Sequence, residues 1–293
     1  MRSSPGHSAH VRFSAQSVWD STNPWTEAQE CVLAPEEEID FDVVFVSGTD
    51  WRRVIPEEQR PRYSKPVVNL IQHVRHACED DTLGRRMLLR HSAIRICVSP
   101  EVERAIVGTG QVRGPVFTIP DAIDVGYVER LAGAGPRDID VLVAANKQPE
   151  LGASLARSLR VADRRVELVD SRVPRSELVG LMGRARVTVA IPNPKEGFYL
   201  PAVEGMAAGT VVVCPDCIGN RSYCLDRENS FRPGYAEEAI RAAAEEALAL
   251  DGTALSDLLG AAHQTARAHD LPGERRAFLD ILDRVDELWA AAY

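Results

Sequence analysis

This sequence has no long apolar run, few lysines and a negative net charge. No apolar stretch approaches the roughly 20 residues that a membrane-spanning helix needs, and the N-terminal residues MRSSPGHSAH lack the apolar core of a secretory signal. A net charge of −9 argues against non-specific electrostatic binding to DNA or RNA. We therefore expect a cytoplasmic protein with no transmembrane segment and no nucleic-acid partner.

Cysteine is also infrequent, with six residues in 293. Their wide dispersal does not fit a disulfide framework and favours a reducing compartment. Cys214 and Cys217 form a CxxC pair and Cys224 follows, but the sequence offers neither a fourth zinc ligand nor a thioredoxin-like context. We expect small buried thiols beside a strand end, no metal site and no cofactor.

What the chain does contain is a regular alternation of short β-branched runs and helical stretches, in both halves. Such runs are typical of parallel strands buried on both faces by helices. Pro, Gly and Asp accumulate between residues 121 and 137, which suggests a boundary. We predict an α/β protein with two doubly wound Rossmann-like domains facing across a cleft. The predicted domains are 1–124 and 125–273, followed by a C-terminal helix, 274–293, that packs back on the first domain.

The expected strands are 11–16, 41–48, 65–73, 94–99 and 116–120 in the first half, and 138–146, 166–170, 187–192 and 210–214 in the second. The expected helices are 76–91, one starting after Ser99, 149–160, 174–185, one starting at Leu200, 236–250, 255–268 and 274–292.

The stretch EGFYLPAVEGMAAGTVVVC, residues 196–214, carries the chemistry. Pro201 suits the first turn of a helix and Gly209 its end. The free amides at the start of that helix form an anion site that fits a diphosphate, and Gly197 lets the backbone approach a ligand. Glu196 precedes the helix and can reach sugar hydroxyls, while Glu204 lies one turn inside and can accept from a ribose diol. The alternative is an ordinary crossover with solvated carboxylates.

Together these residues resemble the retaining glycosyltransferases of the two-domain GT-B fold, family 4-like, or glycosyl transferases group 1. In that family two glutamates separated by seven residues bind the donor, as Glu196 and Glu204 are spaced here. The resemblance extends to IPDAID at 119–124, similar to the family's interdomain link, and to Val173-Pro174 at a helix entry that holds the nucleobase. It covers about Lys65 to Phe231.

Several residues depart from the family pattern. Asn146 and Leu151 stand where the family has the Arg and Lys that neutralise the leaving diphosphate, and Lys147, one of only three lysines, is the nearest replacement. Tyr199 replaces a glycine and is expected to narrow the space near the sugar. A tryptophan-bearing stretch, 17–26, replaces the family's Gly-Gly loop.

The resemblance implies a role for each candidate residue. The first domain would bind the acceptor and the second the nucleotide sugar. The catalytic residues implied are Glu196, His73 and Lys147. The donor-binding residues implied are Asn146, Val173, Gly197, Phe198, Tyr199, Leu200 and Glu204, with the amides of 198–200 at the diphosphate. The acceptor-binding residues implied are Trp19, Trp25 and His76.

The resulting hypothesis is a metal-independent retaining transferase that moves a hexosyl unit from a UDP- or GDP-sugar to a hydroxyl acceptor, a small molecule or a glycan. The sequence leaves a homodimer open. The alternatives are a nucleotide-sugar-binding protein without transfer activity, a sugar-nucleotide epimerase or sugar phosphorylase on the same fold, and a dinucleotide oxidoreductase. The last would need a GxGxxG after a first strand, which neither half has.

Overall fold

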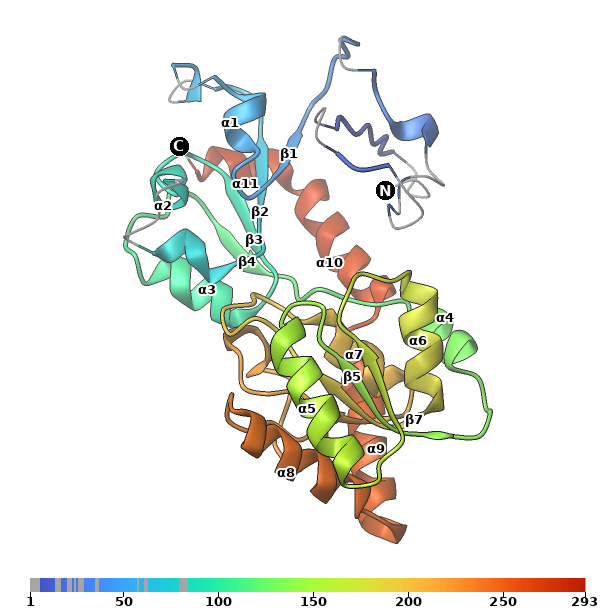
Figure 1. Cartoon of the computed structure of the whole chain (residues 1–293). Coiled ribbons are helices and arrows are strands. Elements are labelled where there is room, and N and C mark those ends of the chain that lie inside the picture. Colours follow the sequence, from blue (N-terminus) through green and yellow to red (C-terminus); the bar gives the residue numbers. More distant parts are fainter. Residues whose placement is uncertain are drawn as a thin grey trace.

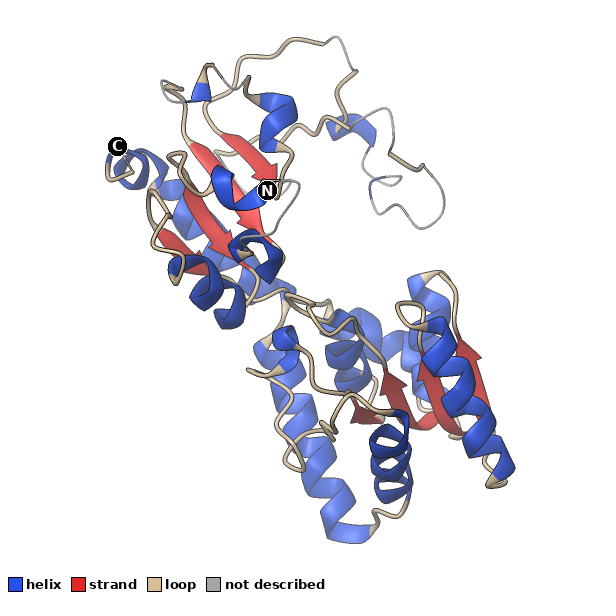
Figure 2. Cartoon of the chain, turned by 60° about the vertical axis from the view of Figure 1, so that its left-hand side comes forward, coloured by secondary structure: helices blue, strands red, loops and turns tan. Residues whose placement is uncertain are grey.

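The computed structural model describes residues 6–13, 17–19, 23, 25, 29–34, 37–56, 58–60, 63–78 and 84–292. Two separate four-stranded sheets, both entirely parallel, form its two layers of strands. Figure 2 shows the two groups of strands in two bodies joined by narrow crossing segments. The predicted α/β class with two Rossmann-like domains is confirmed, whereas the predicted domain limits stay predictions.

The first sheet follows the chain in the order β1-β2-β3-β4. Its strands are β1 (Val44–Ser47), β2 (Val67–Ile71), β3 (Ile94–Cys97) and β4 (Val116–Thr118), connected through α1 (Trp51–Val54), the 3₁₀ turn η4 (Val74–Ala77), α2 (Arg85–Leu88) and α3 (Pro100–Val107). Because successive parallel strands advance in one direction, right-handed connections place these helices on one face. The other face needs a cover from elsewhere in the chain.

That cover comes from the C-terminus. Helices α10 (Leu271–Asp283) and α11 (Val285–Ala290) run back along the first sheet (Figure 1). Ile281, Leu288 and Trp289 are buried in one apolar cluster with residues of the first three strands. The last residues of the described chain are therefore part of the core of the first domain.

The second sheet has the order β6-β5-β7-β8, so the chain reverses direction at β5. Its strands are β5 (Ile139–Ala144), β6 (Val166–Val169), β7 (Ala185–Ala190) and β8 (Val211–Val213). Its helices are α5 (Pro149–Val161), α6 (Arg175–Arg184), α7 (Leu200–Ala207), α8 (Glu237–Leu248) and α9 (Gly252–Ala268). Such a reversal opens a crevice beyond the carboxyl ends of the central strands, β5 and β7, where ligands of open α/β sheets bind.

Two segments cross between the sheets side by side. The amide of Ile123 donates to the carbonyl of His269 at 3.0 Å, and the amide of Leu271 donates to the carbonyl of Ile123 at 3.0 Å. Directly after this pairing, the Asp124 carboxylate caps α4 (Val125–Ala132) by accepting from the Tyr127 amide at 2.8 Å. The paired backbones make the link between the two bodies a short two-stranded connection.

Most expected strands and helices are confirmed, with several differences, among them the unexpected short helix α1. The stretch 11–16 contributes only a bridge between Val11 and Val32 in its described part. The single helix expected over 76–91 is wrong: η4 and α2 lie there, and Gly84, at φ 58°, precedes α2 in a left-handed conformation. The last helix divides at Arg284, and α4 lies within the expected break. Among the described residues no helix is long and apolar enough to cross a membrane.

Candidate functional site

The loops that follow β5 and β7 meet at the crevice of the second sheet. Gln148, after β5, donates from Nε2 to Oδ1 of Asn193, after β7, at 3.0 Å. Asn193 in turn donates from Nδ2 to Oε1 of Glu196 at 2.9 Å. Lys147 Nζ lies 3.5 Å from the same carboxylate oxygen. Because the Glu196 side chain is only 14% exposed while that of Lys147 is 46% exposed, the carboxylate is held in place and the ammonium faces solvent.

Gly197 is the point where this loop touches the first domain. A Cβ at this position would lie 2.1 Å from the carbonyl oxygen of Gln72, just after β2, and 3.1 Å from Cγ2 of Val102 in α3. On its other side Gly219 packs so closely that a Cβ there would lie 2.3 Å from the carbonyl carbon of Gly197. Only glycine fits this layer, so the loop is fixed between the two bodies rather than free in solvent.

His73 lies at the same contact. It precedes η4, and its Nδ1 accepts from the amide of Arg75 at 3.0 Å, which leaves Nε2 as the protonated nitrogen of a neutral ring. Burial lowers the pKa of His73, as do the nearby cations, among them Lys147, while Glu196 opposes them. The structure thus brings the three predicted catalytic residues, His73, Lys147 and Glu196, into one electrostatic neighbourhood.

The second predicted glutamate, Glu204, is buried in α7 and already paired. Its Oε1 lies 2.5 Å from Nε of Arg175, the first residue of α6, and its side chain is 6% exposed. The Arg175 side chain is 45% exposed, and its guanidinium carbon lies 5.7 Å from the ring centre of Tyr127. Sequence reasoning missed Arg175, although it follows the predicted Val173-Pro174 helix entry directly. Val173 is partly buried against the core.

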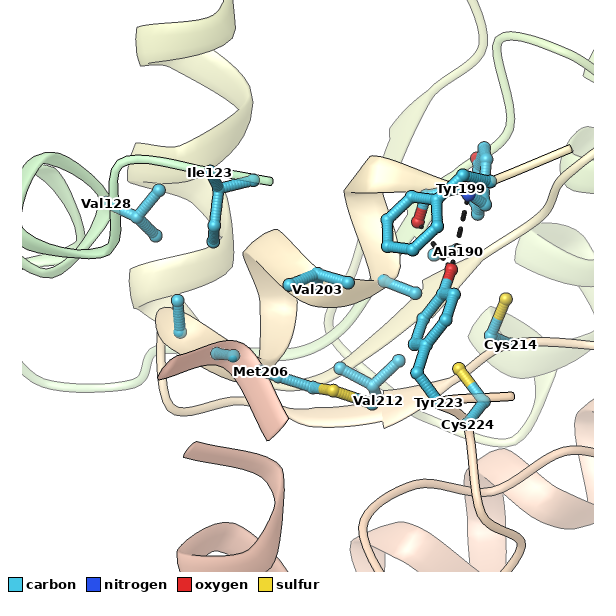
Figure 3. Packing of buried hydrophobic residues seen from close by; sticks show 14 of the residues in the cluster. Ile123, Val128, Ala190, Tyr199, Val203, Met206, Val212, Cys214, Tyr223 and Cys224 are labelled. Carbon is cyan, nitrogen blue, oxygen red and sulfur yellow. Dashed lines mark hydrogen bonds between the residues drawn. The ribbon is translucent and has the colours of Figure 1, made fainter. Parts of the chain in front are cut away.

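Phe198 and Tyr199 point into the core. The Phe198 ring stacks on that of Tyr223, with centroids 4.6 Å apart. Tyr199 is 3% exposed, and its hydroxyl donates to the carbonyl of Ile191 at 3.2 Å. Its amide donates to the hydroxyl of Tyr223 at 3.3 Å (Figure 3). The expectation that Tyr199 narrows the sugar space is therefore wrong, because its ring leaves the crevice. No motif indicated Tyr223. Its hydroxyl accepts from the Tyr199 amide, one of the three amides predicted to bind the diphosphate, so only the amides of Phe198 and Leu200 remain for that role.

Cysteines line the floor below this loop. Cys214 and Cys224 flank Tyr223 in the buried cluster (Figure 3), and Asn220 donates from Nδ2 to Sγ of Cys214 at 3.2 Å. Burial raises the pKa of the Cys214 thiol. These are buried free thiols, as expected from the sequence. No group of three or more potential metal ligands exists among the residues that the structure describes.

The remaining predicted residues have surroundings of their own. Trp19 and Trp25 both contact the ring of Phe13, at 4.8 and 6.2 Å between centroids. His76 is 4% exposed, and its ring faces Gly48, which does not favour contact with an acceptor. Asn146 is exposed after β5, and Leu151 packs against the second core.

Comparison with known proteins identifies a similar family and similar folds. Residues 126–250 match the family described as glycosyl transferases group 1. This segment, which includes all four strands of the second sheet, is therefore similar to a group 1 glycosyltransferase domain. No curated protein sequence matches the chain.

Solved structures extend the similarity of this glycosyltransferase to both domains. Sucrose-phosphate synthase from Thermosynechococcus elongatus superimposes with a TM-score of 0.64 at 15% identity, covering 84% of this chain and 74% of that one. The UDP-forming trehalose-phosphate synthase from Burkholderia xenovorans gives 0.62 at 12% identity, with 82% and 74% covered. HepE from Anabaena, solved with UDP, gives 0.60 at 14% identity, with 75% and 72% covered. At such identities these structures establish the GT-B fold.

Proposed function

We propose that this glycosyltransferase moves a hexosyl unit from a nucleoside diphosphate sugar to a hydroxyl acceptor with retention of anomeric configuration and without a metal. Glu196 positions the donor sugar and Glu204 the ribose, with Val173 and Asn146 beside the nucleotide. The similarity to HepE solved with UDP and to a UDP-forming synthase supports a UDP-sugar as the first donor to test.

The observation that carries the proposal is the convergence of Glu196, Lys147 and His73 where the Gly197 loop meets the first domain. A sugar held by Glu196 would have its anomeric carbon at the junction between the donor and acceptor domains. Neutral His73 offers an N–H donor to a hydroxyl there. Lys147, with the amides of Phe198 and Leu200 at the start of α7, would stabilise the charge that develops on the departing diphosphate.

In this proposal no second carboxylate is needed as a general base, because an oxygen of the departing diphosphate receives the proton of the acceptor hydroxyl on the same face of the sugar. The anchored Glu196 carboxylate then contributes by orienting sugar hydroxyls, which helps most if the contact tightens in the transition state. In this proposal the second domain binds the donor, and the first binds the acceptor whose hydroxyl is the nucleophile.

The test starts with thermal shifts of the full chain against UDP-, GDP- and dTDP-hexoses, followed by turnover of the best donor with a panel of hydroxyl acceptors. Glu196→Gln should lower kcat/KM by about 100-fold or more, because it removes a charge that meets the sugar in the transition state. The exposed Glu167→Gln is the matched control. Equal turnover in the two variants would refute the role of Glu196, and an inverted product anomer by NMR would refute retention.

A second candidate is nucleotide-sugar binding without transfer. It is favoured by the engagement of Lys147 with Glu196, since this lysine is also the nearest replacement for the family's two diphosphate-binding cations. Donor binding by wild type with no nucleoside diphosphate release under any acceptor would favour this candidate.

A further inference from the structure

A cavity of about 850 Å³ lies in the first domain, between the sheet and the start of α10. Its floor is apolar and comes from all four strands or their ends. The residues of the floor and the apolar part of the rim are Phe45, Leu70, Ile96, Ile119, Leu271, Pro272 and Phe278. Cavities of this size with mostly apolar walls are typical of small-molecule sites. We call it the linker cavity, because its rim includes the segments that cross between the domains.

Two exposed apolar side chains lie at this cavity. Phe45 is 46% exposed although it lies in a strand, and Leu271 is 40% exposed. The Phe45 ring meets that of Phe278 edge to face, with centroids 5.6 Å apart, so the aromatic wall is preformed. Apolar surface left open to water in a preformed hollow is available for burial by a ligand.

One end of the linker cavity is acidic. Asp121, Asp124 and Glu274 line it there, and Arg275 and Arg276 lie on exposed positions of α10 at its mouth. Burial, and secondarily Glu274, raises the pKa of Asp121 to about 7, and burial raises that of Glu274. Asp124 caps α4, and the Ala122 amide favours the charged form of Glu274. In the part of the chain that the structure describes, no ion pair involves Asp121.

A half-buried carboxyl group without an ion-pair partner, beside a preformed apolar wall, favours a ligand that brings both an apolar body and a positive charge. The two exposed arginines are screened by solvent and weaken this preference little. We propose that the linker cavity binds organic cations in which an aromatic ring or short alkyl chain carries a protonated amine, with the ammonium at Asp121 and the apolar part against Phe45 and Phe278.

The test uses the full chain and three probes of matched shape: 2-phenylethylamine, 2-phenylethanol and phenylacetate, titrated by calorimetry at pH 8. The amine should bind about tenfold or more tightly than the alcohol, as expected for one added charge-assisted hydrogen bond, and phenylacetate should bind least. Affinity for the amine should fall as the pH is lowered through about 7, because protonated Asp121 no longer attracts the cation. Binding near pH 7 should release protons.

Two variants separate the charge from the apolar wall. Asp121→Asn should abolish the preference for the amine and keep binding of the alcohol, while Asp280→Asn, in α10 but outside the cavity, should change neither. Phe45→Ser, at an exposed position, should weaken all three probes. The proposal is overturned if the three probes bind equally, if none binds at millimolar concentration, or if Asp121→Asn retains the preference for the amine.

Discussion

The tightest contact of the site predicts the effect of adding one methyl group. In Gly197→Ala the new Cβ would lie 2.1 Å from the Gln72 carbonyl oxygen, where ordinary contacts begin at 3.4 Å. The two atoms nearest to the new Cβ are backbone atoms of Gln72, which cannot move aside as a side chain can. The loop and the first domain must therefore separate by about 1 Å. Overpacking of this kind costs about 1–3 kcal/mol, and a shift of about 1 Å at a reacting centre can lower the rate about 100-fold. We expect Tm to fall by about 2–4 °C per kcal/mol.

Differential scanning calorimetry gives Tm, and turnover of the donor identified above gives kcat/KM. Gly180→Ala is the matched control, because a Cβ there meets no atom within 4 Å and the residue lies inside α6. That variant should be stabilised by about 0.4–1 kcal/mol, since alanine restricts the unfolded chain. If Gly197→Ala matched Gly180→Ala in both Tm and kcat/KM, the packed contact between the loop and the first domain would be disproved.

Three more predictions concern buried groups of the chain. Arg175→Ala should destabilise the chain by about 1–2 kcal/mol in urea unfolding, because it leaves a buried Glu204 carboxylate unpaired while water partly replaces the half-exposed guanidinium; an equal effect of Arg172→Ala, at an exposed position, would contradict this. His73→Gln should make Tm less sensitive to acid below about pH 6.5. Because the pKa of His73 is lowered in the folded chain, the unfolded chain takes up this proton first, and native stability is lost as the pH falls through the folded pKa. An unchanged slope of Tm against pH would argue against this role of His73. In the native chain a thiol reagent should react fast with the two partly exposed cysteines and slowly with the four buried ones, which are Cys97, Cys214, Cys217 and Cys224. Early reaction of any of these four thiols would contradict their burial.

The donor loop shows how far local sequence patterns reach. Pro201 at the first turn of α7 and the β-branched run of β8 are local signals, and the helix and strand lie where they predict. Glu196 and Lys147 lie 49 positions apart in the chain, and the family resemblance implied a role for both at the donor; their direct contact at 3.5 Å comes from the structure, where both follow strands of one parallel sheet. Local reasoning failed where partners come from other elements: the Arg175 that pairs with Glu204, and the Tyr223 that draws Tyr199 into the core.

By itself, the sequence determined the α/β class and the alternation of strands and helices, because periodicity and turn residues act over a few positions, while the candidate residues of the second domain came from the family resemblance. Three features were decided only by the tertiary structure: α10 and α11 cover the first sheet, Gly197 packs directly against the backbone of the first domain, and a cavity opens beside Asp121. Those features depend on packing between segments up to about 240 residues apart, which no local pattern encodes.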